Sequence, residues 1–176
     1  RGTQLDRWRR RIRRREFGVT YYGGPCATYS PLHDPQLRTV LEPRGMFYMP
    51  VEWRAHVGHA NDLWDTSALL AREQYDAGGE FIIEHPQRRY LRGKRAYWGA
   101  VAARGVSTPG DMPSILALER DTGAVRVDLS QCAWGSPFQK FTTLLCSPRI
   151  AAKLAHMSLR RCALCDAYEA HKERAV

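Results

Sequence analysis

Cys26 is the residue of this sequence best suited to nucleophilic chemistry. It follows a β-branched and aromatic run, Val19 to Tyr22, and a turn made of two glycines and Pro25. A thiolate is a strong nucleophile, and a tight turn that exposes it near positive charge favours this use. A small buried apolar cysteine has the same local sequence, so the two interpretations stay open at this point.

Glu84 is a second group that chemistry can use. It directly follows Phe81 to Ile83, a short apolar run typical of a parallel strand that is covered on both faces. Ligands bind outside the carboxyl ends of the strands in open parallel sheets. We therefore expect Cys26 and Glu84 to face one cleft from neighbouring strands. A solvated carboxylate at the end of a strand is the alternative for Glu84.

Lys140 supplies a positive charge in a third segment. It lies between an alternating strand, Val125 to Leu129, and a second strand-like run that continues through Leu145. A Gly-Ser-Pro turn precedes Lys140, so the cation is expected at the edge of a loop. The three segments together offer a nucleophile, a carboxylate and a cation.

The elements between these groups predict how they are held. Residues 53–76 carry apolar side chains at helical spacing, which predicts a helix that returns along a sheet. Residues 31–50 contain four prolines and predict a long loop after Cys26. Strand, loop, helix and strand make one βαβ unit with parallel strands. The expected fold class is therefore α/β, with a mainly parallel sheet flanked by helices.

The motifs resemble those of the cytosine-5 DNA methyltransferase family. The nucleophile motif of that family matches Gly24 to Ser30, its Glu-Asn motif at a strand end matches Glu84-His85-Pro86, and its Gly-x-Pro-Gln-x-Arg-x-Arg element matches Gly135 to Thr142 loosely. The chain looks most like the divergent group of phage and algal mobile elements. The resemblance covers about residues 19–146, and it implies a partial Rossmann-like methyltransferase domain.

The resemblance implies a role for each matched residue. Catalysis is expected from Cys26, which would attack carbon 6 of a cytosine swung out of DNA, and from Glu84 and Lys140. Substrate binding is expected from residues of the same motifs: Pro25, Thr28, Ser30, His85 and Gln139. Three positions depart from the better-known enzymes, since Ala27 replaces Gln, His85 replaces Asn and Lys140 replaces Arg. Lysine cannot make the planar bidentate contacts of arginine.

The resemblance also implies S-adenosylmethionine as the methyl donor. The family opens with a strand, a glycine-rich loop and an acidic residue that hold this cofactor, whereas here only an Arg-rich segment precedes Val19. Because the chain opens on Arg1, we expect the carboxyl-terminal part of a longer protein, with a degraded copy as the alternative. The expected parts are an Arg-rich arm at 1–18, a partial catalytic domain at 19–150 and a helical tail containing Cys and His at 151–176.

Positive charge is concentrated in the amino-terminal arm. The chain has a net charge of +9, and residues 1–16 contain eight arginines against Asp6 and Glu16, so six of these charges belong to the arm. Contact with DNA phosphates is expected from arginines of the arm and of a second basic and aromatic cluster: Arg9, Arg10, Arg13, Arg88, Arg89 and Arg92. A solvated helix face or a localisation signal is the alternative.

The tail and the cysteines bear on metals and compartment. Cys162, Cys165 and His171 have the spacing C-x2-C-x5-H, which is an incomplete zinc pattern unless His156 or Cys146 adds a fourth ligand. Five cysteines without a scaffold spacing favour a reducing, intracellular compartment, and the nucleus if the source is eukaryotic. No run is long enough to suggest a membrane span, and no secretory signal is visible.

Two other classes of function compete with the methyltransferase. One is a non-catalytic nucleic-acid-binding remnant of a mobile-element protein, which keeps the fold without the cofactor site. The other is a cysteine hydrolase in which Cys26 works with a histidine, with His33, His59 and His85 as candidates.

Overall fold

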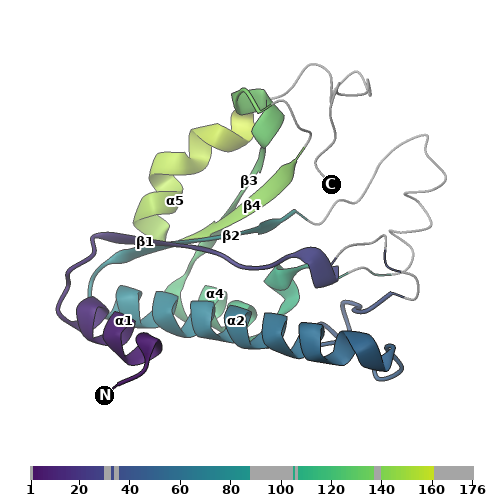
Figure 1. Cartoon of the computed structure of the whole chain (residues 1–176). Helices are drawn as coiled ribbons and strands as arrows, with labels where there is room; N and C mark the ends of the chain where they lie inside the picture. The colour runs from purple at the N-terminus through teal and green to yellow at the C-terminus, as the bar shows by residue number, and fades with distance from the viewer. Residues whose placement is uncertain are drawn as a thin grey trace.

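A four-stranded mixed sheet organises the chain in the computed structural model (Figure 1). The structure describes residues 2–29, 33, 36–87, 105, 107–136 and 140–160. The strands are β1 (Val19–Gly23), β2 (Glu80–Pro86), β3 (Val125–Ser130) and β4 (Phe141–Cys146), in the spatial order β1-β2-β4-β3. The helices and short 3-10 turns are α1 (Gln4–Arg13), η1 (Ala27–Tyr29), α2 (Val51–Asp76), η2 (Pro109–Asp111), α4 (Pro113–Thr122), η3 (Gln131–Trp134), α5 (Pro148–Leu154) and η4 (Ala155–Leu159).

The α/β class is confirmed, but the prediction of a mainly parallel sheet is wrong. Only β1 and β2 pair in parallel, whereas β4 pairs antiparallel with both β2 and β3. It follows that β3 runs in the same direction as β1 and β2. Strand β4 lies between β2 and β3 and runs in the opposite direction. The short β3–β4 connection makes this possible, because antiparallel neighbours need no crossover helix.

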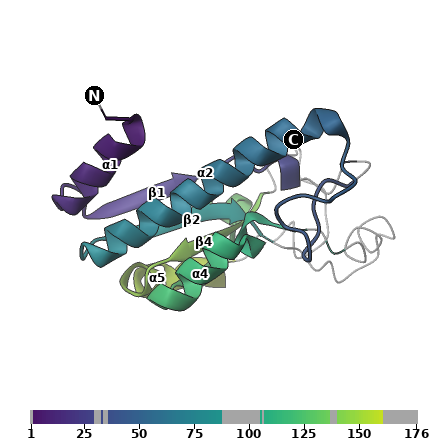
Figure 2. The same ribbon diagram turned by 90° about the horizontal axis from the view of Figure 1, so that it is seen from below.

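The predicted βαβ unit is confirmed in β1, α2 and β2. Helix α2 begins two residues before the expected Trp53 and ends at the expected Asp76. Trp64 and Ala71 of this helix are fully buried against the sheet residues Phe81 and Ile83. Figure 2, seen from below, shows α2 running in front of β1 and β2, with α4 on the same side of the sheet. This face of the sheet is called the α2 face below.

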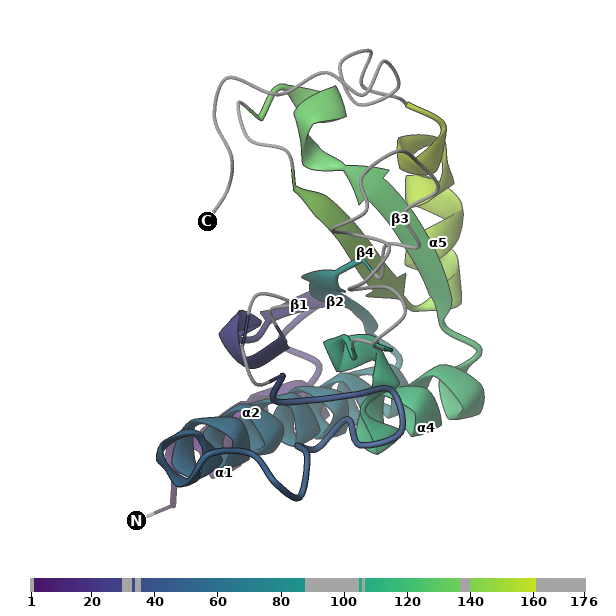
Figure 3. The same cartoon turned by 90° about the vertical axis from the view of Figure 1, so that its right-hand side faces the viewer.

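The opposite face of the sheet is covered by α5 and is called the α5 face. Ile82 of β2 packs there with Val127, Cys146 and Ala151, since successive strand residues point to opposite sides. Figure 3 shows α5 lying beside β3 and β4, away from α2 and α4. On β1 the α5-face side chains Val19 and Tyr21 remain 48% and 58% exposed. The predicted boundary between residues 150 and 151 falls inside α5.

The amino-terminal arm forms the amphipathic helix α1, which packs on α2. Thr3 caps its first turn, Ile12 is buried, and Arg9 and Arg13 pair with Glu73 of α2. The helix thus lies against the carboxyl half of α2, near the amino ends of β1 and β2 (Figure 1).

Candidate functional site

A cluster of polar side chains surrounds Glu84 on the α5 face. In the register of the sheet Glu84 lies opposite Gly23 on one side and Leu144 on the other. Lys140 Nζ donates to Glu84 Oε1 at 2.8 Å, and Gln131 Nε2 lies 3.5 Å from the same oxygen. Tyr21 donates its hydroxyl hydrogen to Glu84 Oε2. We call Tyr21, Glu84, Gln131 and Lys140 the Glu84 cluster.

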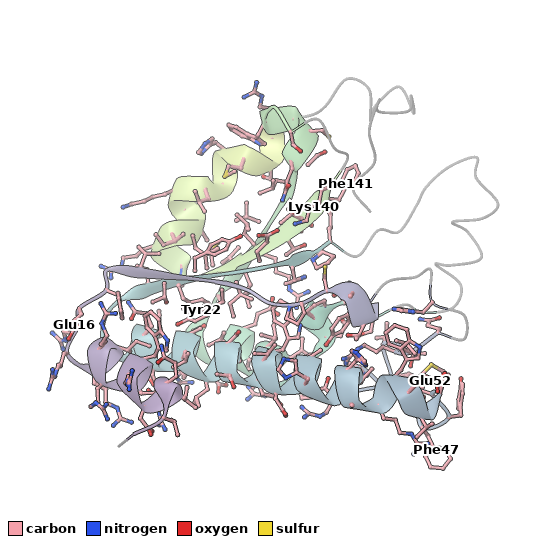
Figure 4. All side chains as sticks on the ribbon, in the orientation of Figure 1. Glu16, Tyr22, Phe47, Glu52, Lys140 and Phe141 are labelled. Atoms are coloured by element: carbon pink, nitrogen blue, oxygen red, sulfur yellow. The ribbon has the colours of Figure 1, made fainter. Side chains whose placement is uncertain are left out.

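Residues far apart in the sequence are brought together in this cluster. Glu84 and Lys140 are separated by 56 positions, and Tyr21 lies 63 positions before Glu84. Lys140 directly precedes β4, and in Figure 4 it lies above the sheet whereas Tyr22 points to the side of α2. Gln131 also donates to Thr142 Oγ1 at 3.0 Å, so β4 fixes the amide that faces Glu84.

The surroundings of Glu84 favour its ionised form. Partial burial by itself would raise the pKa of this carboxyl, but the hydrogen bonds from Lys140 and Tyr21 and the positive charge of Lys140 outweigh burial, and the pKa is lowered. Burial and the hydrogen bond to Glu84 raise the pKa of Tyr21. The cluster is therefore a carboxylate held between an ammonium and a neutral phenol.

Cys26 lies three residues beyond the end of β1 and is exposed, so the buried apolar interpretation of this cysteine is wrong. The turn before it packs on the α2 face. Trp64 Nε1 donates to the Pro25 carbonyl oxygen at 3.1 Å, and a Cβ on Gly24 would lie 2.8 Å from the Trp64 ring. Only glycine fits at this close approach.

Cys26 follows β1, and Glu84 lies within the adjacent parallel strand β2, two residues before its end, but the two belong to different layers. The Cys26 turn is fastened to α2, whereas the Glu84 side chain lies on the α5 face. No hydrogen bond joins Cys26 to the Glu84 cluster among the described residues. That both border one cleft at the carboxyl edge stays a prediction.

The turn that carries Cys26 is also held by a buried arginine. Arg38, only 1% exposed, donates from Nε to Thr28 Oγ1 at 3.2 Å and from Nη1 to Asn61 Oδ1 at 2.7 Å. Its guanidinium lies 4.0 Å from the centre of the Tyr29 ring. Thr28, expected to bind substrate, is thus buried and used in this packing. Ser30 and Gln139 lie outside the described residues.

His85, also expected to bind substrate, lies on the α2 face. It is 3% exposed, its Nδ1 is 3.0 Å from the Pro86 carbonyl oxygen, and a Cβ on Gly110 would lie 2.8 Å from its ring. Burial lowers the pKa of His85 and favours the neutral ring. His85 and Glu84 are therefore on opposite sides of β2.

The histidines proposed for a hydrolase do not pair with Cys26. His33 Nε2 lies 3.0 Å from the Ala27 carbonyl oxygen, and its ring stacks edge-on against Trp53. His59 is an exposed residue of α2, and His85 is buried in another layer. Within the part of the chain that the structure describes, no imidazole hydrogen-bonds the Cys26 thiol.

The arginines of the arm divide into two sets. Arg9 and Arg13 pair with Glu73, whose side chain is only 17% exposed, and so fasten α1 to α2. Arg10 is exposed. The other expected phosphate contacts, Arg88, Arg89 and Arg92, lie outside the described residues.

Metal and membrane sites receive no support from the described ranges. Cys162, Cys165 and His171 are not among them. Cys146, one possible fourth ligand, is fully buried, and burial raises its pKa to about 11, which opposes the thiolate that zinc requires. The described ranges contain no group of three candidate metal ligands and no helix long and apolar enough to cross a membrane.

The described residues do not fit S-adenosylmethionine. An adenosyl cofactor needs a glycine turn that the ligand can approach and a free carboxylate for the ribose. The Gly-Gly turn after β1 is filled by Trp64, and both carboxylates of β2 are engaged, Glu84 in its cluster and Glu80 by Ser147 and Arg149.

Comparison of the chain with models of protein families, with curated proteins and with solved structures gave no match. The function of the site can therefore be inferred only from its own contacts. Sequence reasoning found Glu84 and Lys140 but missed Tyr21, Gln131 and Thr142. The alternation of β1 puts Tyr21 and Gly23 on one face, but only the register with β2 brings Tyr21 to Glu84.

Proposed function

We propose that this chain carries the cysteine and the base-binding carboxylate of a DNA cytosine-5 methyltransferase-like protein, which transfers a methyl group from S-adenosylmethionine through a covalent cysteine adduct. The observation that carries this proposal is the 2.8 Å ion pair between Glu84 and Lys140, beside the parallel strand that leads to Cys26. Two of the three segments of the resemblance, those of Glu84 and Lys140, meet in this ion pair, and the Cys26 turn follows the neighbouring strand.

The chemistry assigned to these groups is addition to the cytosine ring. The Cys26 thiolate adds to carbon 6 of a cytosine that has left the base stack, and the electron pair of the 5,6 double bond shifts into the bond between carbons 4 and 5, so that negative charge develops at ring nitrogen 3. Glu84, once it has taken up a proton from water, passes this proton to ring nitrogen 3 and neutralises the charge that develops there. Lys140 keeps the carboxyl in place and supplies positive charge.

The addition can be tested without a methyl donor. Once the thiolate has added to carbon 6, carbon 5 can take a proton from water, lose its original hydrogen and expel the thiolate. Cytosine in DNA labelled with tritium at carbon 5 should therefore release tritium to water when this chain is present. We expect release to be lost in Cys26→Ser and to fall about 10²- to 10⁴-fold in Glu84→Gln.

Two control variants test whether the release depends on the assigned cysteine and carboxylate. Cys132→Ser changes a second cysteine, in η3, and should leave the release unchanged. Glu80→Gln changes the other carboxylate of the same strand and face, which pairs with Arg149, and should alter stability without altering release. Release that depends on Cys132 and not on Cys26 would reject the assigned nucleophile.

A non-catalytic nucleic-acid-binding protein is the second candidate, and the exposed arginines of α1 favour it. Arg7 and Arg10 of α1 and Arg14, the residue that caps its carboxyl end, are spaced to share one face, and all three are exposed. DNA binding of normal strength without any tritium release would select this second function.

A further inference from the structure

Tyr21 is the least expected member of the Glu84 cluster. Its hydroxyl donates to Glu84 Oε2, while Lys140 and Gln131 face Oε1. Both oxygens of the carboxylate therefore have donors, which favour the charged acceptor over the neutral acid. Tyr21 is the one partner of these that comes from β1, the strand that leads to Cys26.

Local geometry explains how Tyr21 reaches Glu84. Tyr21 pairs with Ile82 in the register, so Glu84 is its diagonal neighbour, two residues further along β2. The residue directly opposite Glu84 is Gly23, and a Cβ there would lie 3.6 Å from Tyr21 Cε1 and 4.0 Å from Glu84 Oε2. These are ordinary van der Waals distances, so a methyl group would fit there, whereas a longer side chain would compete with the tyrosine ring for the space beside Glu84.

We propose that Tyr21 is a positioning residue that holds Glu84 ionised until a base binds. This inference rests on the proposed function, in which Glu84 must carry a proton to nitrogen 3 of cytosine. A carboxylate can only accept hydrogen bonds, whereas ring nitrogen 3 is itself an acceptor, so the held form cannot satisfy the base. Binding of cytosine therefore requires Glu84 to take up a proton and to turn its acid group from Tyr21 to the base.

The other groups around Glu84 act in a known direction. Lys140, which directly precedes β4, favours the ionised form of Glu84 through its positive charge. Gln131 of η3 is neutral. His85, the next residue in β2, lies on the other face, where burial favours its neutral ring. Removing the Tyr21 hydroxyl should therefore weaken, but not abolish, the preference for the carboxylate.

The experiment is a ¹³C NMR titration of the Glu84 side-chain carboxyl in the whole chain, assigned with Glu84→Gln. We expect Tyr21→Phe to move the titration to higher pH, because a donor to the charged form is lost. Lys140→Met should move it further in the same direction. Tyr22→Phe is the matched control, since this tyrosine is on the same strand and packs on the α2 face, and it should leave the titration in place.

Tritium release at neutral pH gives the second measurement. If Tyr21 only holds Glu84 before binding, Tyr21→Phe should keep or increase the rate of release. A titration that does not move in Tyr21→Phe, or a rate that falls as far as in Glu84→Gln, would overturn the inference. A titration that moves as expected while no variant releases tritium would support the holding contact and reject the proposed function.

Discussion

Glu84 and His85 are adjacent in β2, yet their surroundings favour opposite charge states. Glu84 meets donors on the α5 face, which lower its pKa and keep it charged. His85 is buried on the α2 face, and burial lowers its pKa and keeps it neutral. The alternation of a strand thus separates two titratable neighbours, and each acquires a pH dependence of its own.

His85 should make the fold sensitive to mild acid. An unfolded histidine binds its proton with a pKa of about 6.5, whereas the folded protein resists protonation, so stability is complete above this pH and is lost as the pH falls below it. We expect the free energy of unfolding by urea to fall between pH 6.5 and the lower folded pKa, by at most about 1.4 kcal/mol per pH unit.

The comparison of variants isolates this effect from that of other groups. His85→Gln keeps a polar side chain that does not titrate, so the difference in unfolding free energy between wild type and variant should narrow as the pH falls. His56→Gln, an exposed residue of α2, should give a curve parallel to that of the wild type. Parallel curves for both variants would mean that His85 does not cause the acid sensitivity.

At the scale of elements, the arginines of the arm fall into two sets, one that fastens α1 to α2 and one that is exposed to solvent. Arg9 and Arg13 form ion pairs with Glu73, whereas Arg7, Arg10 and Arg14 are exposed and form none of the ion pairs found among the described residues. Each phosphate contact that is lost reduces the slope of log affinity against log salt by about 0.9 on duplex DNA. The free set can therefore be tested by changing three residues to glutamine together.

The triple variant of Arg7, Arg10 and Arg14 should bind random duplex DNA more weakly and with a flatter salt dependence, measured by fluorescence anisotropy. The double variant Arg9→Gln and Arg13→Gln removes fewer charges from the same helix and should mainly loosen α1. Deleting the whole arm is a poorer experiment, since Ile12 is 2% exposed and its loss would uncover α2. Equal salt slopes in the two variants would assign the whole arm to packing.

The sequence predicted elements better than their pairing. Helix α2 and strands β1 and β2 were predictable because their periodic apolar residues meet one core, with Trp64 and Phe81 both fully buried. The reversed insertion of β4 was not, since β2–β4 pairing joins residues about 60 positions apart and leaves no local signal. Tyr21 was missed for the same reason. Its contact depends on the register between β1 and β2, which cannot be read from β1 alone.

At the scale of the whole molecule, the two proposed binding regions lie at opposite ends of the sheet. Figure 4 shows Glu16, just after α1, at one end and Lys140 toward the other. Helix α1 packs near the amino ends of β1 and β2, whereas Cys26 and Glu84 lie toward the carboxyl ends of these strands. Loss of the α1 arginines should therefore weaken DNA binding without changing the tritium released by each bound complex.

The chain by itself should bind little S-adenosylmethionine, which isothermal titration calorimetry can measure. The glycine turn after β1 is packed against Trp64, and Glu80 and Glu84 are both held by cations, so the described residues offer neither the close approach nor the free carboxylate that an adenosyl group needs. Duplex DNA titrated into the same sample gives the control for folded protein. Binding of S-adenosylmethionine in the micromolar range would contradict this expectation, and it would direct the search for a cofactor site to residues outside these strands.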